Sequence, residues 1–501
     1  MAKALRNRAS KLHYNSQSQL LLPGFDSPFS QHLNPLNRWV VLAGKIPWDS
    51  LVDVYQSQMR NTRTGADGIN PRVAIGALII KHMCDLSDRE TVLQIQENMY
   101  MQYFIGFSGF SDEEPFDPSL FVDFRKRLGT EQINIINERI LGLSKSEQPS
   151  TEADKKMSDD QPTGEDADNK QGTVNKAVDV AISNKGQLIV DATACPQDIR
   201  YPTDLDLLND AREKSEQLID HLFCASRHLS KPRTYRKIAR TVYLKTAQKR
   251  HKTRREIRNA IKRQLNYLKR NIKNIHKLLE ACDVVPLDRY QYKYLLVIQV
   301  FYDQQAMMYA QKTHKVDHRI VSIHQPHVRP IVRGKTTAKV EFGAKIEVSI
   351  MNGFSFLEEL SWEAYNEGTR LMSTVDRYKK RFGYYPKEVL VDKIYCTRDN
   401  RTALKKSGIL LRGKPLGRPK AVEAHVRPGE RNPIEGKFGQ AKTAYGMNRI
   451  KARLQQTSQS WIASIIMVLN LVKLAGQIPY YLLLKMINQF LLLINMMPAE
   501  G

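Results

Sequence analysis

Two things are scarce in this chain: paired cysteines, and acidic residues to balance its cations. The five cysteines among 501 residues form no Cys-x-x-Cys pair, which argues against a disulfide framework and a cysteine-based zinc site. Asp and Glu number 52 against 77 Lys and Arg, leaving a net charge of +25. The natural partner of such a chain is a polyanion, and nucleic acid is the first candidate.

No secretory signal or membrane span is predicted at either end of the sequence. The first residues, MAKALRNRASKLHY, are basic but lack the apolar core of a signal. From Trp461 to Met497 the chain is strongly apolar, but Asn470, Lys473 and other polar residues leave no clean run of about 20 apolar residues. We therefore expect core or interface helices here, an apolar C-terminal helix over 476–501, no membrane partner, and a location in a reducing cytoplasm.

The N-terminal part reads as a compact helical domain followed by a linker. Over 36–129 apolar residues recur at helical spacing, and Ser87-x-x-Glu90 is typical of a capping box at a helix start. The segment 145–176 is polar and acidic without large apolar residues. Such a composition predicts a disordered linker, because it buries too little to offset the cost of ordering.

A strongly basic stretch follows inside a predicted helical insertion over 204–282. Between His221 and Glu280 the chain has nineteen Lys or Arg and two Glu, and the spacing suits one or two long helices with an apolar seam. A solvated hairpin is one reading. The charge imbalance favours a face covered by the DNA backbone, because this surface repels itself otherwise. The candidate DNA contacts in it are Arg254, Arg255, Arg258, Lys262 and Arg263.

Around this insertion the pattern predicts an α/β sheet that carries acidic residues at its edge. A short apolar strand over 188–190 ends in Asp191, and a strand over 388–395 carries Asp392. Between them we predict strands over 319–328, 338–350 and 354–362, with a turn at 351–353, and then a helix over 364–383. A last helix is expected with Asn432 as N-cap, Pro433 in its first turn and Glu435 close behind.

Three carboxylates on two strands and a helix suggest a metal site, because Mg²⁺ prefers oxygen ligands and keeps waters for phosphate substrates. Each residue also has a simpler explanation. Asp191 or Asp392 can cap the turn after its strand, and Asn432-x-x-Glu435 is itself a capping box.

Several motifs resemble those of bacterial insertion-sequence transposases, specifically the IS-five-like group. They are LIVDATACPQDIRYPTDLDLLNDAR, IVSIHQPHVRPIVRGK, VEFGAKIEVSIMNGFSFLEELSWEAYNEG, YCTRDNRTALKKSGI, LGRPK and RNPIEGKFGQAKTAYGMNRIKARL. The resemblance implies a ribonuclease-H-like α/β catalytic domain over 185–475, with the basic helical insertion after its first strand. The helical block over 36–129 resembles the all-helical N-terminal domain that accompanies this core.

The resemblance also implies roles for individual residues. Asp191, Asp392 and Glu435 correspond to the DDE acids that hold two Mg²⁺ ions, or Mn²⁺ in their place. Related families surround the Glu in a Y-x2-R-x3-E-x6-K pattern, which Arg431 and Lys442 match. The Tyr position holds Pro428 instead, which puts the terminal-base contact in doubt.

Arg431, Lys437 and Lys442 are accordingly the candidate DNA contacts on the last helix. The implied reaction is cleavage of double-stranded DNA at the element's terminal repeats, followed by attack of the freed 3′-hydroxyl on target DNA. Two ends must be joined, so at least a homodimer is expected. For the N-terminal block, recognition of the terminal repeats and a purely structural or dimerising role are both open.

Two weaker signals and three rival functions complete the sequence analysis. His314, His318, His324 and His327 cluster, but no Cys or Glu completes a metal site. The basic turn over 417–420 resembles a minor-groove hook, though a loop that touches phosphate explains it as well. The rivals are a nuclease that does not join strands, a catalytically idle DNA-binding descendant and, more weakly, an RNA-binding protein.

Overall fold

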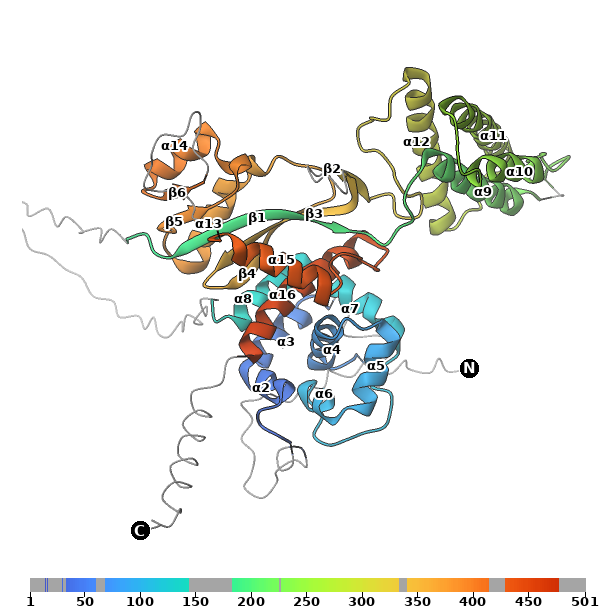
Figure 1. Ribbon diagram of the computed structural model, residues 1–501. Helices are drawn as coiled ribbons and strands as arrows, with labels where there is room; N and C mark the ends of the chain where they lie inside the picture. Colours follow the sequence, from blue (N-terminus) through green and yellow to red (C-terminus); the bar gives the residue numbers. More distant parts are fainter. Residues whose placement is uncertain are drawn as a thin grey trace, which may run out of the picture.

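The computed structural model describes residues 14, 16, 29, 33–59, 68–143, 183–224, 227–332, 340–413 and 429–476. These residues form an N-terminal group of helices, a mixed β-sheet with helices on both faces, and a helical arm (Figure 1). Several predictions concern the rest of the chain and lie outside the described residues. They are the acidic linker over 145–176, the C-terminal helix beyond Gly476, the basic turn over 417–420 and the position of Pro428.

The N-terminal region is helical, as predicted. Asn70 caps α4 with Pro71 in the first turn, and the Ser87 side chain accepts a hydrogen bond from the Glu90 N–H at the start of α5. The helix α4 is buried on nearly every side and forms the centre of the group. The elements are α2 (Arg38–Lys45), α3 (Trp48–Gln56), α4 (Pro71–Met83), α5 (Asp88–Glu97), α6 (Met99–Phe104), η1 (Pro118–Leu120), α7 (Phe121–Arg127) and α8 (Thr130–Ile140).

The sheet has the order β2-β3-β1-β5-β6, and β4 also pairs with β3. β1 runs antiparallel to β3 and parallel to β5, and β5 runs parallel to β6. The mixed sheet agrees with the predicted α/β class. Its strands are β1 (Gln187–Pro196), β2 (Arg329–Val332), β3 (Val340–Met351), β4 (Phe354–Ser361), β5 (Glu388–Leu390) and β6 (Leu410–Arg412).

The strand predicted over 319–328 is wrong, because pairing begins only at Arg329. Ile320 and Ile323 are buried in the core of the helical arm. These apolar residues therefore pack against helices and do not belong to a strand. A local turn interrupts the segment, where the Gln325 N–H donates to the Ser322 hydroxyl. The predicted turn over 351–353 is confirmed: Asn352 and Gly353 both have positive φ and join β3 to β4.

Helices cover both faces of the sheet. On one face lie α13 (Leu371–Phe382), which starts later than predicted because the short η2 (Glu367–Thr369) precedes it, and α14 (Arg398–Lys406). On the other lie α15 (Asn432–Ala444) and α16 (Gln455–Ala475), between the sheet and the N-terminal helices (Figure 1).

The helix α16 is the core helix that the sequence predicts. It is long and apolar enough to cross a membrane by length and composition, yet most of it is buried. One continuous hydrophobic core joins the N-terminal helices, α16 and one face of the sheet.

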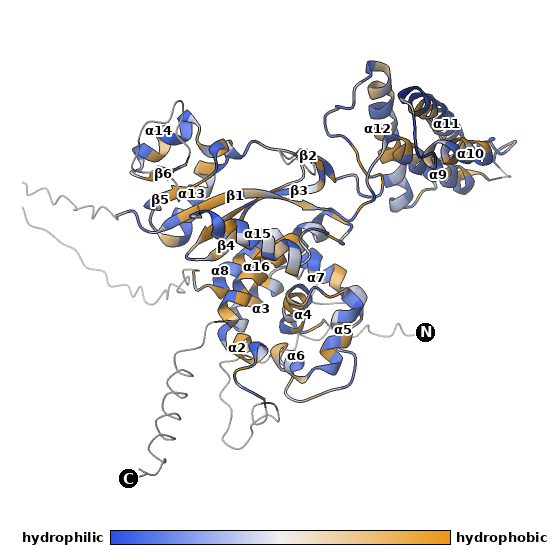
Figure 2. Cartoon of the chain, viewed as in Figure 1, coloured by the Kyte–Doolittle hydropathy of each residue, from blue (hydrophilic) through white to orange (hydrophobic). Residues whose placement is uncertain are grey.

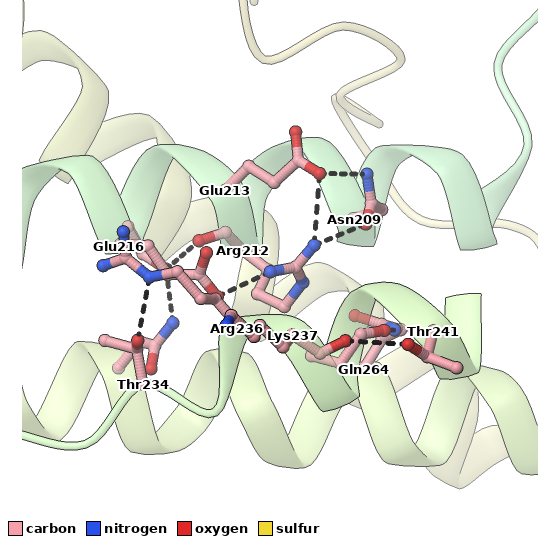
Figure 3. Close-up of polar contacts among 12 residues, drawn as sticks. Asn209, Arg212, Glu213, Glu216, Thr234, Arg236, Lys237, Thr241 and Gln264 are labelled. Carbon is pink, nitrogen blue, oxygen red and sulfur yellow. Dashed lines mark hydrogen bonds and ion pairs between the residues drawn. The ribbon is translucent and has the colours of Figure 1, made fainter. Parts of the chain in front are cut away.

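The helical arm is inserted between β1 and β2 and has a hydrophobic core of its own. It consists of α9 (Asp204–Leu222), α10 (Arg236–Ala247), α11 (Arg254–Glu280) and α12 (Arg289–Gln311), so it includes one helix beyond the predicted end at residue 282. Its interior holds a buried polar group, Arg212, which pairs with Glu216 at 2.5 Å and contacts Asn209 and Glu213 (Figure 3). Gln264 of α11 donates to a backbone carbonyl of α10 and ties these two helices together.

Candidate active site and basic face

Two aspartates follow neighbouring parallel strands at the same edge of the sheet. The register of β1 and β5 pairs Ile189 with Leu390. Asp191 and Asp392 each lie two residues beyond this pair, Asp191 still within β1 and Asp392 at the start of the short η3 (Lys393–Tyr395). The predicted strand over 388–395 is therefore shorter than expected and ends before Asp392. Parallel strands in register bring residues at matching positions side by side, and this explains the pairing. The first strand, which was predicted to end at Asp191, continues to Pro196.

Arg431 holds the two aspartates together. Its guanidinium pairs with Oδ2 of Asp191 at 3.0 Å and with Oδ1 of Asp392 at 3.2 Å. Asp191 also accepts a hydrogen bond from the Ala192 N–H. Burial raises the pKa of the Asp191 carboxyl, and the charge of Arg431 offsets part of that shift. Arg431 was expected to contact DNA, whereas here it neutralises the carboxylate pair.

Glu435 lies on α15, one helical turn after Arg431. Side chains four residues apart on a helix lie about 5–6 Å apart at Cβ, so Glu435 is a neighbour of the bridge although its own side chain is exposed. The predicted cap is wrong by one position: Arg431 is the N-cap, Asn432 is already helical, and no side chain caps this end. Ile434, Phe438 and Ala441 fix the helix against the core.

The oxygen-only donor set of these carboxylates fits a hard divalent cation. Arg431 places a positive charge between the two aspartates. Among the described residues, however, no three His, Cys, Asp or Glu side chains lie close enough together to hold a metal ion. Glu435 is thus not gathered with the aspartates in this arrangement.

Two acidic residues that the sequence pattern did not single out, Glu367 and Glu347, lie near Asp191. The charge of Glu367, paired with Lys345 at 2.7 Å, contributes to the raised pKa of Asp191. Glu347 is fully buried between the sheet and α13, where Thr374 and Tyr395 donate hydrogen bonds to it. Burial raises the pKa of Glu347 to about 7. Both glutamates fall within the motif over 340–368, which gave them no role. Their proximity to Asp191 depends on the pairing of β1 with β3 and on the path of the chain after β4.

The other candidate residues on α15 have different surroundings. Lys437 is partly buried, and burial lowers its pKa. Lys442 lies two turns beyond Glu435 and is also partly buried. Both lie on the helix that carries Glu435, close in sequence to the aspartate bridge.

The four histidines do not converge. His314 lies 3.4 Å from Asp204, and His318 lies 2.9 Å from Glu363. His324 contacts the Tyr294 hydroxyl, and His327 stacks edge-on against Trp362. Each ring has its own partner, and this favours the structural reading over a metal site.

The helix α11 presents a row of exposed cations, and Figure 2 shows it largely in blue. Its apolar seam packs into the core of the arm, and the opposite face carries exposed basic residues at spacings of seven or four. These are Arg255, Lys262, Lys269, Lys273 and Lys277, which we call the basic row.

The remaining predicted contacts on α11 divide into two kinds. Arg254 and Arg263 are exposed beside the basic row. Arg258 turns inward, where it donates to the Tyr309 carbonyl at 3.0 Å and covers the ring of that residue. Its guanidinium is therefore held by α12, which makes it the least suited of the five to bind a phosphate.

Two family models match opposite ends of the chain. One, described as "Transposase DDE domain", matches residues 389–472, a range that includes Asp392, α15 with Glu435 and most of α16. The other, described as "Transposase domain (DUF772)", matches residues 27–127 in the N-terminal helices. The DDE domain implies a ribonuclease-H-like fold for the sheet, and the mixed strand order is in keeping with it.

A curated relative and the solved structures add less. The "Uncharacterized protein ORF8 in nfe locus" of Rhizobium meliloti is 38% identical over 97 residues, which are 19% of this chain and 46% of that relative. The chain thus covers less than half of the relative's length. No solved structure matches the chain. Transposase domains thus match both the N-terminal helices and the segment that carries Asp392 and Glu435, and these two matches support a DDE transposase of a bacterial insertion sequence.

Proposed function

We propose that this protein is the transposase of an IS-five-like insertion sequence, which cuts DNA at the element's ends and joins them to target DNA by metal-dependent phosphoryl transfer. The observation that carries the proposal is the shared ion pair of Asp191 and Asp392 with Arg431. Asp191 and Asp392 lie 201 positions apart in the sequence. Two carboxylates held this close repel each other unless a cation lies between them, and a cation-binding site accounts for their placement.

In this proposal the carboxylates of Asp191, Asp392 and Glu435 hold two divalent ions, Mg²⁺ or Mn²⁺ in its place. Bound there, the ions would activate the attacking oxygen and stabilise the leaving one. In this proposal the exposed side chain of Glu435 changes its rotamer to reach the metal ions beside the two aspartates. Arg431, freed from the aspartates, is positioned with Lys437 and Lys442 to hold the DNA phosphates near the reacting bond.

The basic row supports DNA as the substrate. Lys277 lies 22 positions after Arg255 on this helix, a rise of about 33 Å at 1.5 Å per residue. This length is close to one turn of B-DNA, about 34–36 Å. A row of cations on a rigid helix can therefore follow the backbone for about one turn, and the release of counterions would supply affinity without sequence specificity.

The N-terminal helices have a structural role in this proposal and, in addition, contact the terminal repeats. The N-terminal helices and α16 belong to one hydrophobic core, which supports the structural role. Recognition of the repeats rests on the match to a transposase domain. The homodimer that two DNA ends require, and association with the nucleoid, are parts of the same proposal.

The test is cleavage and strand transfer on a duplex that carries the flanking element's end, with Mg²⁺ and then Mn²⁺. We expect Asp191→Asn, Asp392→Asn and Glu435→Gln to bind the duplex as wild type does but to cut and join at least about 10³-fold more slowly, since each removes charge stabilisation of the transition state. Asp399→Asn, an exposed aspartate on α14, is the matched control and should retain activity.

The outcomes separate the competing functions. Cutting without joining by the wild type would favour a nuclease. Binding without cutting in any metal would favour an idle DNA-binding descendant. Full activity of Glu435→Gln together with loss in both aspartate variants would show that another residue supplies the third acid.

A further inference from the structure

The helix α12 has two apolar faces, and the described residues cover one of them. Leu295, Ile298 and Phe301 face the core of the arm. On the opposite side Tyr292, Leu296, Val300 and Met307 are 48%, 48%, 52% and 41% exposed. These four residues, which we call the α12 stripe, lie four, four and seven positions apart and so share one face of the helix.

Such a stripe is unlike the scattered apolar residues that ordinary surfaces carry. It covers about four turns of a straight helix, over about 22 Å from its first to its last residue. The described residues include nothing that buries it, since its side chains remain about half exposed in the folded chain.

The charge of this face differs from that of the neighbouring helix. The helix α11 has nine Lys or Arg and two Glu, whereas α12 has Arg289, Lys293 and Asp303 as its only charged residues. A strongly basic chain repels its copies over most of its surface. The α12 stripe is a place where two arms can approach with little repulsion, while the basic row of each remains free for DNA.

We propose that the α12 stripe is a docking surface for a second copy of this chain, with the two α12 helices antiparallel about Ile298. In this register Leu296 lies level with Val300 of the second copy, and Lys293 lies level with Asp303 of the second copy. The surface is therefore complementary to itself, as a two-fold interface requires. The inference uses only the surface of the arm and does not depend on the proposed chemistry.

The expected dimer is weak. Standard stable interfaces bury about 800 Å² on each partner, and a helix pair along about 22 Å provides less than that. We therefore expect a dissociation constant in the micromolar range without DNA.

Sedimentation velocity of the full chain from about 1 to 100 µM, without DNA, tests the proposal. The wild type should pass from monomer to dimer. Leu296→Glu should raise the dissociation constant at least about 10-fold, because it places two charges in the apolar contact. Ile238→Glu, at a 57% exposed apolar position on α10, is the matched control and should dimerise as the wild type does.

A charge exchange tests the register itself. Lys293→Glu sets Glu against Asp303, and Asp303→Lys sets Lys against Lys293, so each should weaken the dimer several-fold, while the double variant should restore it. A wild type that stays monomeric at 100 µM, or a dimer that Leu296→Glu leaves intact, would overturn the docking surface. Single charge variants that dimerise as the wild type does would overturn the antiparallel arrangement.

Discussion

The N-terminal helices and the inserted arm are both built from helices, yet they relate to the sheet in opposite ways. The N-terminal helices share one hydrophobic core with α16 and the sheet. The arm packs around a core of its own. At its junction with the sheet lies a cavity of about 420 Å³, lined by charged groups that include Asp198, Arg200, Asp210 and Arg453.

This difference indicates a division of labour. A dry, shared core fixes the position of α15 relative to β1 and β5, which the proposed chemistry requires. A polar junction costs less to rearrange than a packed apolar one, because water can solvate its charged groups when the surfaces part. The proposed binding of DNA by the basic row would therefore allow the arm to adjust against the sheet without disturbing the shared core.

The largest expected effect comes from breaking the shared core at one polar residue. Asn470 of α16 is fully buried; it accepts from the Ser355 N–H of β4, and it donates to the Ser355 carbonyl and to Asn137 of α8. Asn470→Ala leaves these groups unpaired and should cost about 3–5 kcal/mol of unfolding free energy. We expect the N-terminal helices and the sheet to loosen together in hydrogen exchange.

Asn271→Ala provides the matched change in the arm. Asn271 is buried on α11 and donates to the Ser215 hydroxyl of α9 at 2.9 Å. Its loss should speed hydrogen exchange in the arm and leave α16 and the N-terminal helices as protected as in wild type. If Asn271→Ala loosened both regions equally, the separation of the two cores would be wrong.

The next-largest expected effect tests whether the arm binds DNA through the basic row. Replacing Lys262, Lys269 and Lys273 with Gln should lower affinity for duplex DNA by up to about 100-fold near 0.15 M salt, because each phosphate contact contributes about 0.9 to the salt slope. The plot of log K against log salt should become shallower by up to about 2.7. Fluorescence anisotropy across a salt series measures both.

The control replaces three exposed lysines on α13 and α14, Lys379, Lys380 and Lys405, with Gln. It changes net charge equally but leaves the basic row intact. Equal losses in the two triple variants would mean that net charge, and not the arm, holds the DNA.

Several features of the sheet and of the arm could be predicted from local patterns in the sequence. The acidic positions at 191 and 392 were predictable because each follows a short apolar run in the sequence, and the Asn352-Gly353 turn because both residues tolerate positive φ. The basic row was predictable from a one-sided charge imbalance. The core helix α16 could be distinguished from a membrane span by polar residues such as Asn470, whose pairing the structure now explains.

Other features depend on contacts distant in the sequence. Ile320, Val321 and Ile323 form a short apolar run of the kind that strands carry, but Ile320 and Ile323 are buried in the core of the helical arm. The shift of the α15 cap from Asn432 to Arg431 goes with the use of Arg431 by two aspartates from elsewhere in the chain. The placement of Glu347 and Glu367 near Asp191 requires the pairing of β3 with β1 and the path of the chain after β4. Local periodicity carries no information on such tertiary pairing.

A smaller expected effect is the pH dependence of stability caused by the buried Glu347 carboxyl. The pKa of Glu347 is about 7, above its ordinary value because of burial. Below pH 4.5 this carboxyl is protonated whether the chain is folded or unfolded. As pH rises from 4.5 to 7 the unfolded chain loses the proton first, so the stability it contributes is lost progressively up to about pH 7.

Glu347→Gln mimics the protonated form and should remove this loss. We expect urea denaturation to give nearly equal stability for variant and wild type at pH 4.5, and a more stable variant at pH 7.5. Glu131→Gln, an exposed position on α8, should follow the wild type at both pH values. A variant that is less stable than wild type at pH 7.5 would show that the charged form is the one stabilised.

The smallest expected effect concerns the aspartate bridge. Arg431→Gln leaves Asp191 and Asp392 without their shared cation and should cost about 1 kcal/mol at low salt, a modest value because Asp392 is 56% exposed. Added Mg²⁺ should then stabilise the variant more than the wild type, since a cation that binds only the folded state stabilises it and Arg431 no longer competes.

Arg412→Gln is the matched control, because Arg412 pairs with Glu388 and Glu430 and not with the aspartates. Thermal unfolding at 0 and 10 mM Mg²⁺ compares the three proteins, and hydrogen exchange locates the change. If Mg²⁺ slowed hydrogen exchange around α15, β1 and β5 in Arg431→Gln alone, the cation site would lie at the sheet and α15, and not in the arm. An equal Mg²⁺ effect in all three proteins would mean that Arg431 and the metal do not share a site, and the bridge would then be a structural ion pair.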